Sequence, residues 1–402
     1  MAILASEFGD PAAGRMGGFG WAARETARLF HAFPEAGVEP IFLHADRRYE
    51  GHELHGVRVV PRAGSKLRYL ARLRAVRPDL LLAVDWRPNY LRAVMALPRT
   101  PLAVWVRDPR TPADVRRLAA LRDPAAPELP PAGLEGIDCT SLARVARIGR
   151  LLPRRLALVT PEPSLAAKVD DTYGLSAQVH LLPNPVALPE GPFVKSPRPT
   201  VVFLGRLDPY KRPWLLVSLA RAMPDVEFRA AGSAHFAGPR GWQPPAELPP
   251  NLMLLGHVDG VEKQRLLGEA WALVNTSVHE GLAVSFIEAL ASETPLAAFV
   301  DTGGVVSRFG VCAGPEEGTG EAGVPRLVAA LRRLLGDGAL RERLGREGRR
   351  WVAATHGPER FLAGFDALCE RLGVRRALTR SATPAPPGAR RWPAARRTAT
   401  RP

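Results

Sequence analysis

The chain has 402 residues, of which 46% are apolar and 24% are charged, so its length predicts two domains and its composition excludes a disordered or fibrous chain. No apolar run approaches the ~18 residues of a membrane span, and no basic flank of a signal peptide precedes the first apolar stretch. The net charge is +15, and three scattered cysteines (Cys139, Cys312, Cys369) exclude a disulfide framework and a zinc site of paired thiolates. We therefore expect a soluble, cytoplasmic protein, and we attribute its arginine bias to a GC-rich bacterial genome.

Short apolar runs alternate with longer amphipathic stretches, a pattern typical of βαβ units with parallel sheets. In the first half, strands are expected at Ala2–Ser6, Pro40–Ala45, Leu80–Val84, Leu102–Val106 and Leu156–Thr160, and helices at Trp21–Phe30 and Lys66–Val76. In the second half, strands are expected at Thr200–Leu204, Val226–Ala231, Leu252–Gly256, Ala272–Thr276 and Leu296–Val300, and helices at Trp214–Met223, Val261–Glu269, Ser285–Ala291 and Val324–Leu335. The expected fold class is α/β, with two Rossmann-like domains whose parallel sheets face a central cleft.

Composition also predicts the domain boundaries. Residues 1–185 form the expected first domain, the proline-rich residues 186–199 a linker, and residues 200–358 the second domain. A last helix is expected at 359–374, followed by a disordered tail at 375–402 that holds eight arginines and no acid. Such a tail is either solvated chain or an electrostatic tether to anionic lipid or nucleic acid.

The first candidate site is the turn Gly205–Pro213, which follows a buried strand and precedes an amphipathic helix. Ligands of open α/β sheets bind at the carboxyl ends of such strands. The turn carries Arg206 and Lys211, with Arg212 beside them, and cations placed there suit a diphosphate whose charge must be balanced as it leaves. The alternative is a basic surface turn.

The second candidate site is His279–Glu288, directly after another predicted strand. Glu280 falls in the loop and Glu288 one turn into the next helix, and the start of that helix is an anion site. Two carboxylates beside an anion site suit a ligand that also offers hydroxyls, as a sugar nucleotide does. The alternative is that both are surface acids near a helix start, where acids are favoured. We expect His279 to be structural rather than catalytic.

The third candidate is the glycine loop Gly17–Gly20, which opens a helix. Gly18 also begins a G-x-G-x-x-A match to the dinucleotide fingerprint, so binding of NAD is an alternative. That fingerprint should follow the first strand directly, whereas about ten residues intervene here, and Asp46 is the nearest candidate for the ribose-binding acid. In either case glycine lets backbone amides approach an anion.

Taken in order, the glycine loop, the G-R-x4-K turn at Gly205–Lys211 and the E-x7-E pair Glu280 and Glu288 resemble a family-4 (group 1) retaining glycosyltransferase of the GT-B fold. The resemblance is strongest over Val201–Gly304 and extends more loosely over the chain before the tail. It therefore implies a hexosyltransferase-like enzyme that transfers a sugar from a nucleoside-diphosphate sugar.

The resemblance implies a role for each matching residue. Arg206 and Lys211 would bind the diphosphate of the donor, and the backbone at Gly18 would approach it from the first domain. Glu280 would contact the transferred sugar on the face where its anomeric carbon reacts, and Glu288 would hold the ribose hydroxyls. The backbone amides at the start of the following helix would assist; they belong to Leu282, Ala283 and Val284.

The same resemblance implies the course of the reaction and the partners. Transfer would retain the anomeric configuration, with the leaving phosphate helping to deprotonate the acceptor. Neither a metal nor another cofactor would be required, and the last helix would cross back to pack on the first domain. The partners would be the nucleotide-sugar donor and a glycan, lipid or small-molecule acceptor that the sequence does not identify.

One segment departs from the family pattern. Where many members end a first-domain strand with a His-Asp pair, this chain has Arg107-Asp108. On that alignment Arg107 would contact a phosphate or charged sugar, and Asp108 would position an acceptor hydroxyl as a second catalytic candidate. The substitution leaves open a nucleotide-sugar-binding protein that has lost transfer, and a GT-B nucleotide-sugar epimerase is a further alternative.

A basic amphipathic stretch provides a hypothesis for localisation. Ser65–Pro78 carries one lysine and four arginines among leucines and a valine, which suits either an ordinary domain helix or a helix lying on an anionic membrane at its inner face. Nucleic acid is not an expected partner, because the two halves lack the interleaved aromatic and basic residues typical of such proteins.

Overall fold

A computed structural model describes residues 1–5, 17–43, 52–61, 65–125, 127–128, 142, 145–146, 155–175, 178–236 and 241–374. The predicted disordered tail at 375–402 therefore lies outside the described residues, as does Asp46. The described chain divides into two compact units. Unit 1 takes its residues from 1–111, 137–185 and 356–374, and unit 2 takes its residues from 112–128 and 186–355.

Unit 1 is built on an eight-stranded sheet with the order β3-β4-β2-β1-β5-β6-β7-β8. Its strands are β1 (Ala2–Leu4), β2 (Ile41–Leu43), β3 (Glu53–Leu54), β4 (Val57–Val60), β5 (Leu81–Val84), β6 (Leu102–Trp105), β7 (Leu156–Thr160) and β8 (Val179–Leu181). Every pair is parallel except β3 with β4. The central strands are wholly buried, which explains their unbroken apolar sequences, since helices cover both faces of such a sheet.

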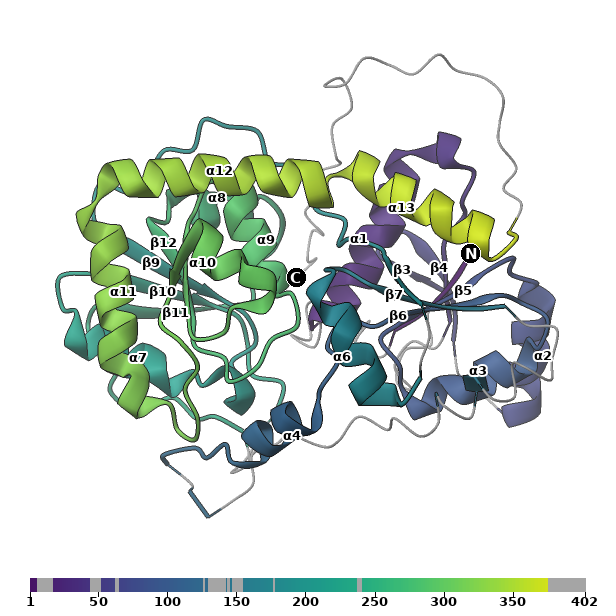
Figure 1. The fold of residues 1–402 in the computed structure, drawn as a ribbon, viewed down its shortest axis with the longest axis horizontal. Coiled ribbons are helices and arrows are strands. Elements are labelled where there is room, and N and C mark those ends of the chain that lie inside the picture. The colour runs from purple at the N-terminus through teal and green to yellow at the C-terminus, as the bar shows by residue number, and fades with distance from the viewer. Residues whose placement is uncertain are drawn as a thin grey trace, which may run out of the picture. The chain divides into compact units, whose positions relative to one another are not determined.

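The helices of unit 1 divide between the two faces of its sheet (Figure 1). They are α1 (Gly18–Ala32), α2 (Lys66–Val76), α3 (Leu91–Ala96), α6 (Ser164–Tyr173) and α13 (Pro358–Arg371). Leu102 and Val104 of β6 pack in one core cluster with Leu73 of α2. Trp105 points to the other face, where its ring contacts Phe361 of α13 at a centroid distance of 6.1 Å. Because side chains alternate along β6, this strand packs against α2 on one face and against the last helix, α13, on the other.

Unit 2 is built on a six-stranded parallel sheet with the order β11-β10-β9-β12-β13-β14. Its strands are β9 (Thr200–Leu204), β10 (Glu227–Ala231), β11 (Leu252–Gly256), β12 (Ala272–Asn275), β13 (Leu296–Ala298) and β14 (Gly310–Cys312). Its helices are α4 (Pro112–Ala119), α7 (Trp214–Ala222), α8 (Gly260–Glu269), α9 (Val284–Ala291), α10 (Val305–Phe309), α11 (Val324–Gly336) and α12 (Gly338–His356), the last of which ends at the boundary with unit 1.

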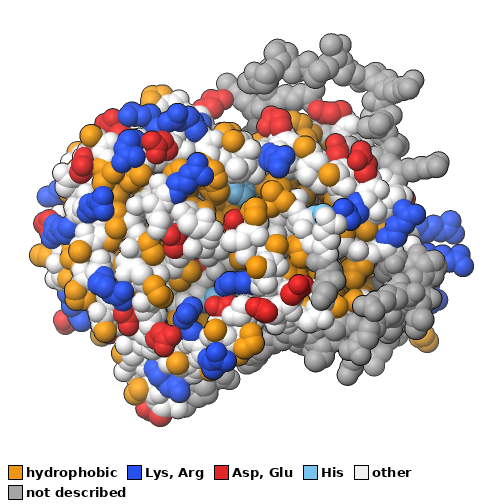
Figure 2. Space-filling model, viewed as in Figure 1, with side chains coloured by type: hydrophobic (Ala, Val, Ile, Leu, Met, Phe, Trp, Pro, Cys, Tyr) orange, Lys and Arg blue, Asp and Glu red, His pale blue; other side chains and the backbone are white. Residues whose placement is uncertain are grey.

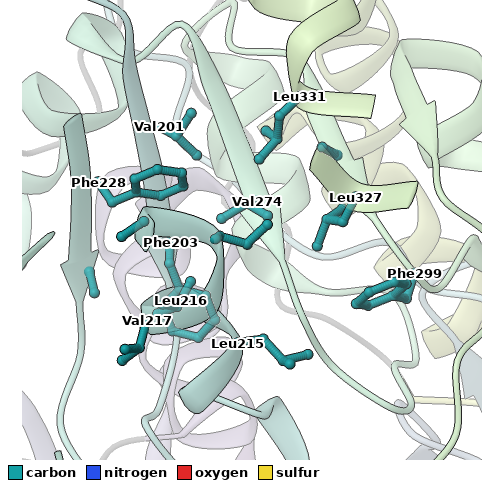
Figure 3. Packing of buried hydrophobic residues seen from close by; sticks show 14 of the residues in the cluster. Val201, Phe203, Leu215, Leu216, Val217, Phe228, Val274, Phe299, Leu327 and Leu331 are labelled. Atoms are coloured by element: carbon teal, nitrogen blue, oxygen red, sulfur yellow. The ribbon is translucent and has the colours of Figure 1, made fainter. Parts of the chain in front are cut away.

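The main core of unit 2 lies between its sheet and two helices (Figure 3). Val201 and Phe203 alternate along β9 and point to the same face, where Leu216 of α7 and Leu331 of α11 pack against them. Each fully buried side chain of this size contributes roughly 1.5–3 kcal/mol through removal of apolar surface from water. This core fixes the ends of β9 and β12, from which the candidate site extends.

The division of the described chain differs most from the expected boundaries in the first half. Residues 1–185 were expected to form one domain, yet residues 112–128, including α4, group with unit 2. The reason is tertiary packing, because Leu118 and Leu121 are 3% and 0% exposed within the core cluster of unit 2. An amphipathic helix pattern does not specify which sheet will cover its apolar face.

The surface of the described chain carries both signs of charge. Over the visible face of the part that contains α7 and α11, Lys and Arg side chains are interspersed with Asp and Glu (Figure 2). In α2, Tyr69 and Leu73 are buried while Arg68, Arg72 and Arg74 are exposed, and membrane contact by this helix stays a prediction. Among the helices that the structure describes, none is both long enough and apolar enough to cross a membrane.

Candidate functional site

The first loop of the candidate site joins β9 to α7. Leu204 ends the buried strand, Pro209–Lys211 form a short 3-10 turn, and Arg212 takes a left-handed conformation with φ of 48° before α7 begins. The end of β10 approaches this loop closely, since a Cβ added to Gly232 would lie 1.8 Å from the carbonyl oxygen of Gly205. Only glycine fits at Gly232, whose φ is also +146°, so this contact fixes the height of the loop above the sheet.

Arg206 is held on the loop by polar and aromatic contacts. Its Nη2 donates to the Tyr210 hydroxyl at 3.0 Å, its Nη1 lies 3.2 Å from Nδ1 of His235, and its Nε lies 3.3 Å from the Asp208 carboxylate. Asp208 is itself buried and accepts from the backbone N–H of His235 at 2.8 Å. The guanidinium is therefore placed before any ligand binds, which reduces the entropy cost of binding an anion.

Lys211 and Glu280 form an ion pair between the two predicted motifs. Both side chains are largely buried, and the ammonium also lies 4.9 Å from the centre of the Tyr210 ring, which the Arg206 guanidinium faces at 5.4 Å. Burial alone would lower the pKa of Lys211, but the charge and hydrogen bond of the Glu280 carboxylate and the phenol group of Tyr210 outweigh it and raise that pKa. The structure thus brings together Arg206, Lys211 and Glu280, as the sequence predicted for a common site.

The Glu280 carboxylate has two further donors. Its Oε1 accepts from the Asn275 side-chain amide at 2.9 Å and from the Ser277 hydroxyl at 2.6 Å. The backbone carbonyl of Glu280 accepts from the Thr302 hydroxyl at 3.0 Å. A carboxylate held by several charge-assisted or neutral hydrogen bonds keeps one position, so Glu280 is fixed independently of Lys211.

Arg212 has a different role from its two basic neighbours. It is fully buried, and its guanidinium donates to the carbonyls of Thr276, Ser277 and Glu316 at 2.7–3.1 Å. Burial lowers its pKa to about 10, with the Glu316 carboxylate acting in the opposite direction. Arg212 therefore joins the first loop to the segment that precedes Glu280 and is not available to a ligand.

The helix α9 follows Glu280 and begins at Val284, with Ala283 as its N-cap and no side chain capping it. The first N–H groups of a helix lack acceptors within the helix, and those of Ala283 and Val284 are among them, whereas Leu282 precedes the N-cap. Binding of an anion by these three amides stays a prediction. Glu288 lies farther along α9 and pairs with Lys263 of α8 at 2.7 Å. The structure therefore places Glu288 in a second ion pair, distinct from that of Lys211 and Glu280.

The remaining predicted residues lie in unit 1. Gly18 is exposed at the first position of α1, and a side chain there would meet no atom within 4 Å, so close packing does not require this glycine. Arg107 is buried two residues beyond β6, where it bonds the Asn184 side-chain oxygen and stacks 4.7 Å from the Trp105 ring. Asp108 accepts from Arg110 at 2.7 Å.

The comparisons with known proteins agree with the motifs. Residues 189–351 match the family model of glycosyl transferases group 1. This segment is similar in sequence to a group 1 glycosyltransferase domain. No curated protein matches the chain in sequence. The matched segment contains Arg206, Lys211, Glu280 and Glu288 of the candidate site, whereas α4 and the whole of unit 1 lie outside it.

Solved structures of similar fold show that the chain has the GT-B fold. HepE from Anabaena, in complex with UDP-glucose, has a TM-score of 0.65 at 14% identity, covering 92% of this chain and 99% of its own. Sucrose-phosphate synthase from Thermosynechococcus elongatus has a TM-score of 0.66 at 18% identity, covering 92% and 98%. TarM from S. aureus, in complex with fondaparinux, alpha-GlcNAc-glycerol and UDP, has a TM-score of 0.54 at 15% identity. The match covers 74% of this chain but spans only 57% of TarM.

The sequence motifs did not predict the residues that hold the loops of the candidate site. Asn275 and Ser277 both donate to the Glu280 carboxylate. Their position at the end of a predicted buried strand could have indicated them, because a buried polar side chain needs a hydrogen-bond partner. Asp85 in unit 1 was also missed, although it ends β5 just as Asp108 follows β6. It is 2% exposed with φ of 58°, and burial raises its pKa to about 6, helped by Asp108 and opposed by Arg87.

Within the described ranges, no cluster of three or more His, Cys, Asp or Glu side chains could hold a metal ion. Two cations, Arg206 and Lys211, instead face the Tyr210 ring. Lys211 also pairs with the Glu280 carboxylate. Organic cations at a helix start suit phosphate oxygens, and a fixed carboxylate suits hydroxyl groups. The candidate site therefore fits a ligand that carries both.

Proposed function

We propose that the protein transfers a glycosyl group from a nucleoside-diphosphate sugar, with a uridine diphosphate the first candidate, to a hydroxyl-bearing acceptor with retention of configuration. The observation that carries this proposal is the ion pair of Lys211 and Glu280, which joins a cationic turn to a fixed carboxylate beside the start of α9. The uridine assignment draws on HepE and TarM, whose structures contain UDP-glucose and UDP.

Donor binding would exchange the partner of Lys211. The ammonium would turn from Glu280 to the diphosphate, with Arg206 and the α9 amides as further donors. Glu280 would keep its position, because Asn275 and Ser277 still bond its Oε1, and it would gain lone pairs for a sugar hydroxyl. Recognition of phosphate and recognition of sugar would thus be coupled through one broken ion pair.

The transfer itself would need few protein groups. The bond between the anomeric carbon and the diphosphate oxygen breaks, and a bond to the acceptor oxygen forms on the same face of the sugar. The acceptor proton passes to the leaving phosphate, which departs as the nucleoside diphosphate. Arg206 and Lys211 would stabilise the negative charge that develops on that leaving group. The cations present would supply this without a metal ion.

The proposal is tested by a melting-temperature panel with UDP-, GDP-, ADP- and dTDP-sugars and NAD. A ligand present at about 100 times its dissociation constant should stabilise the protein by roughly 2.7 kcal/mol. We expect one nucleotide family to raise the melting temperature of the wild type but not of Lys211→Ala. Lys195→Ala is the matched control, because Lys195 bonds Thr294 in the same unit but away from Glu280.

Activity completes the test. Product formation from the active donor, followed by NMR of the new anomeric proton, should show a retained configuration and should require an acceptor. Conversion of the donor without any acceptor would instead indicate an epimerase, binding without transfer would indicate an inactive binding protein, and a shift with NAD alone would overturn the proposed function.

A further inference from the structure

Helix α4 lies outside the matched family segment, yet it packs in unit 2. Its apolar face is formed by Leu118 of the helix and Leu121 just beyond it, both buried in the core cluster that contains Trp214 and Leu215. Val115, on the same helix, is 48% exposed. Since the helix is anchored by core packing, a polar group on its buried face is held at a defined position in unit 2.

Asp114 is that polar group. It precedes Leu118 by one helical turn, is 5% exposed, and has its Oδ1 3.4 Å from Nδ1 of His279, which is 3% exposed. Arg117 lies 3.6 Å from the same carboxylate and 3.5 Å from Glu317. Burial of a carboxylate and an imidazole costs free energy that an apolar pair of similar size would not, so core packing alone does not account for them.

His279 directly precedes Glu280 in a loop that is held on its other side. Arg212 donates to the carbonyls of Thr276 and Ser277, and the backbone N–H of Val278 donates to the Tyr210 carbonyl at 3.1 Å. These bonds hold residues 276–278 against the loop that joins β9 to α7. The contact with Asp114 fixes the next residue from α4, and a carboxylate beside Nδ1 favours the imidazole tautomer with its proton on that nitrogen.

We infer that Asp114 is a positioning residue of the donor site, acting through His279 on Glu280. The inference rests on the proposed function, in which Glu280 contacts the transferred sugar. Displacement of a reacting group by about 1 Å can lower a rate by roughly a hundredfold, so a loop held from one side only would turn over slowly. The donor site of this chain is therefore completed by a segment from its first half.

Two variants of Asp114 test the inference. Asp114→Ala removes the oxygen that faces His279, while Asp114→Asn keeps one. We expect Asp114→Ala to lower kcat about tenfold or more with a smaller change in the donor KM, and Asp114→Asn to recover most of that loss. Asp225→Ala is the matched control, because Asp225 is an exposed carboxylate of the same unit that pairs with Arg332. It should leave both constants unchanged.

Amide hydrogen exchange provides a readout that needs no donor. In Asp114→Ala, exchange at residues 276–283 should be about tenfold faster, while exchange in β9 stays as in the wild type. Equal acceleration in β9 would show general destabilisation and overturn the inference, as would unchanged exchange in the loop. Asp114→Ala combined with His279→Ala should be no slower in turnover than the worse single variant, since both remove the same contact.

These measurements separate the two proposals. If the wild type binds no nucleotide sugar, the proposed function fails, and hydrogen exchange still decides whether Asp114 fixes the loop before Glu280. If the wild type transfers sugar and Asp114→Ala equals it in kcat and in loop exchange, the positioning inference alone fails.

Discussion

Both sheets present charged residues near their carboxyl ends, but the two units neutralise these charges in different ways. In unit 2, Lys211 and Glu280 come from different strand ends and meet each other, so a ligand with phosphate and hydroxyl groups can replace each partner. In unit 1, Arg107 donates to the Asn184 side-chain oxygen and stacks on the Trp105 ring, and Asp108 accepts from Arg110. An exchangeable pair, an ion pair whose two partners a ligand can replace, suits ligand binding. Charged side chains that bond neighbours within their own unit contribute mainly to structure.

The first and largest expected effect concerns the exchangeable pair. Lys211→Ala should lower the free energy of unfolding by about 3–5 kcal/mol, because it leaves the Glu280 carboxylate buried without its cation. Lys211→Ala with Glu280→Gln should recover a large part of that loss, since no buried charge then remains unpaired. Urea denaturation at pH 7 measures both. A single variant as stable as the wild type would show that Lys211 and Glu280 do not depend on each other.

The second prediction concerns Asp85, a buried carboxylate of unit 1. Burial raises the pKa of Asp85 to about 6, above its ordinary value, so the stability it contributes is present below pH 4 and is lost as the pH rises to 6. Asp85→Asn should therefore gain stability relative to the wild type over that range, reaching at most about 3 kcal/mol above pH 6.

Urea denaturation at pH 4, 5, 6 and 7 checks this change. Asp79→Asn, which alters an exposed carboxylate of unit 1, serves as the control. If the difference between Asp85→Asn and the wild type stays constant with pH, Asp85 does not titrate as its burial predicts.

The third and smallest expected effect concerns Arg107 in unit 1. Arg107→Gln should lower the free energy of unfolding by about 1–2 kcal/mol through loss of the bond to Asn184 and the contact with the Trp105 ring. Affinity for the donor, measured by calorimetry, should change little. A loss of donor affinity that exceeds the loss of stability would instead support the sequence prediction that Arg107 contacts the sugar or its phosphates.

The buried parts of the sheets could be predicted from sequence almost residue by residue. Thr200–Leu204 and Leu156–Thr160 are strands with the predicted bounds, because a parallel strand covered on both faces needs an unbroken apolar run. The short strands Val57–Val60 and Val179–Leu181 and the charged helix Gly338–His356 were not predicted. Their residues are few or largely exposed, so local pattern carries little signal.

In the candidate site, too, some residues could be predicted from the sequence and others could not. Arg206, Lys211 and Glu280 could be predicted because they stand at fixed offsets from predicted strand ends, and parallel strands bring those ends to one edge. Pairings that depend on packing could not be predicted. The contact of Asp114 with His279 needs α4 to dock on a sheet encoded more than seventy residues later, and no local rule specifies that choice.

Helix α13 has a consequence for the order in which the protein matures during synthesis. Its Phe361 and Phe365 pack edge-to-face on Phe30 of α1, roughly 330 residues earlier in the chain. At ~5–20 residues per second, a ribosome needs roughly 15–65 s to add that length. Unit 1 therefore begins the chain but is completed last, and until then Phe30 and Trp105 stay uncovered and open to chaperones.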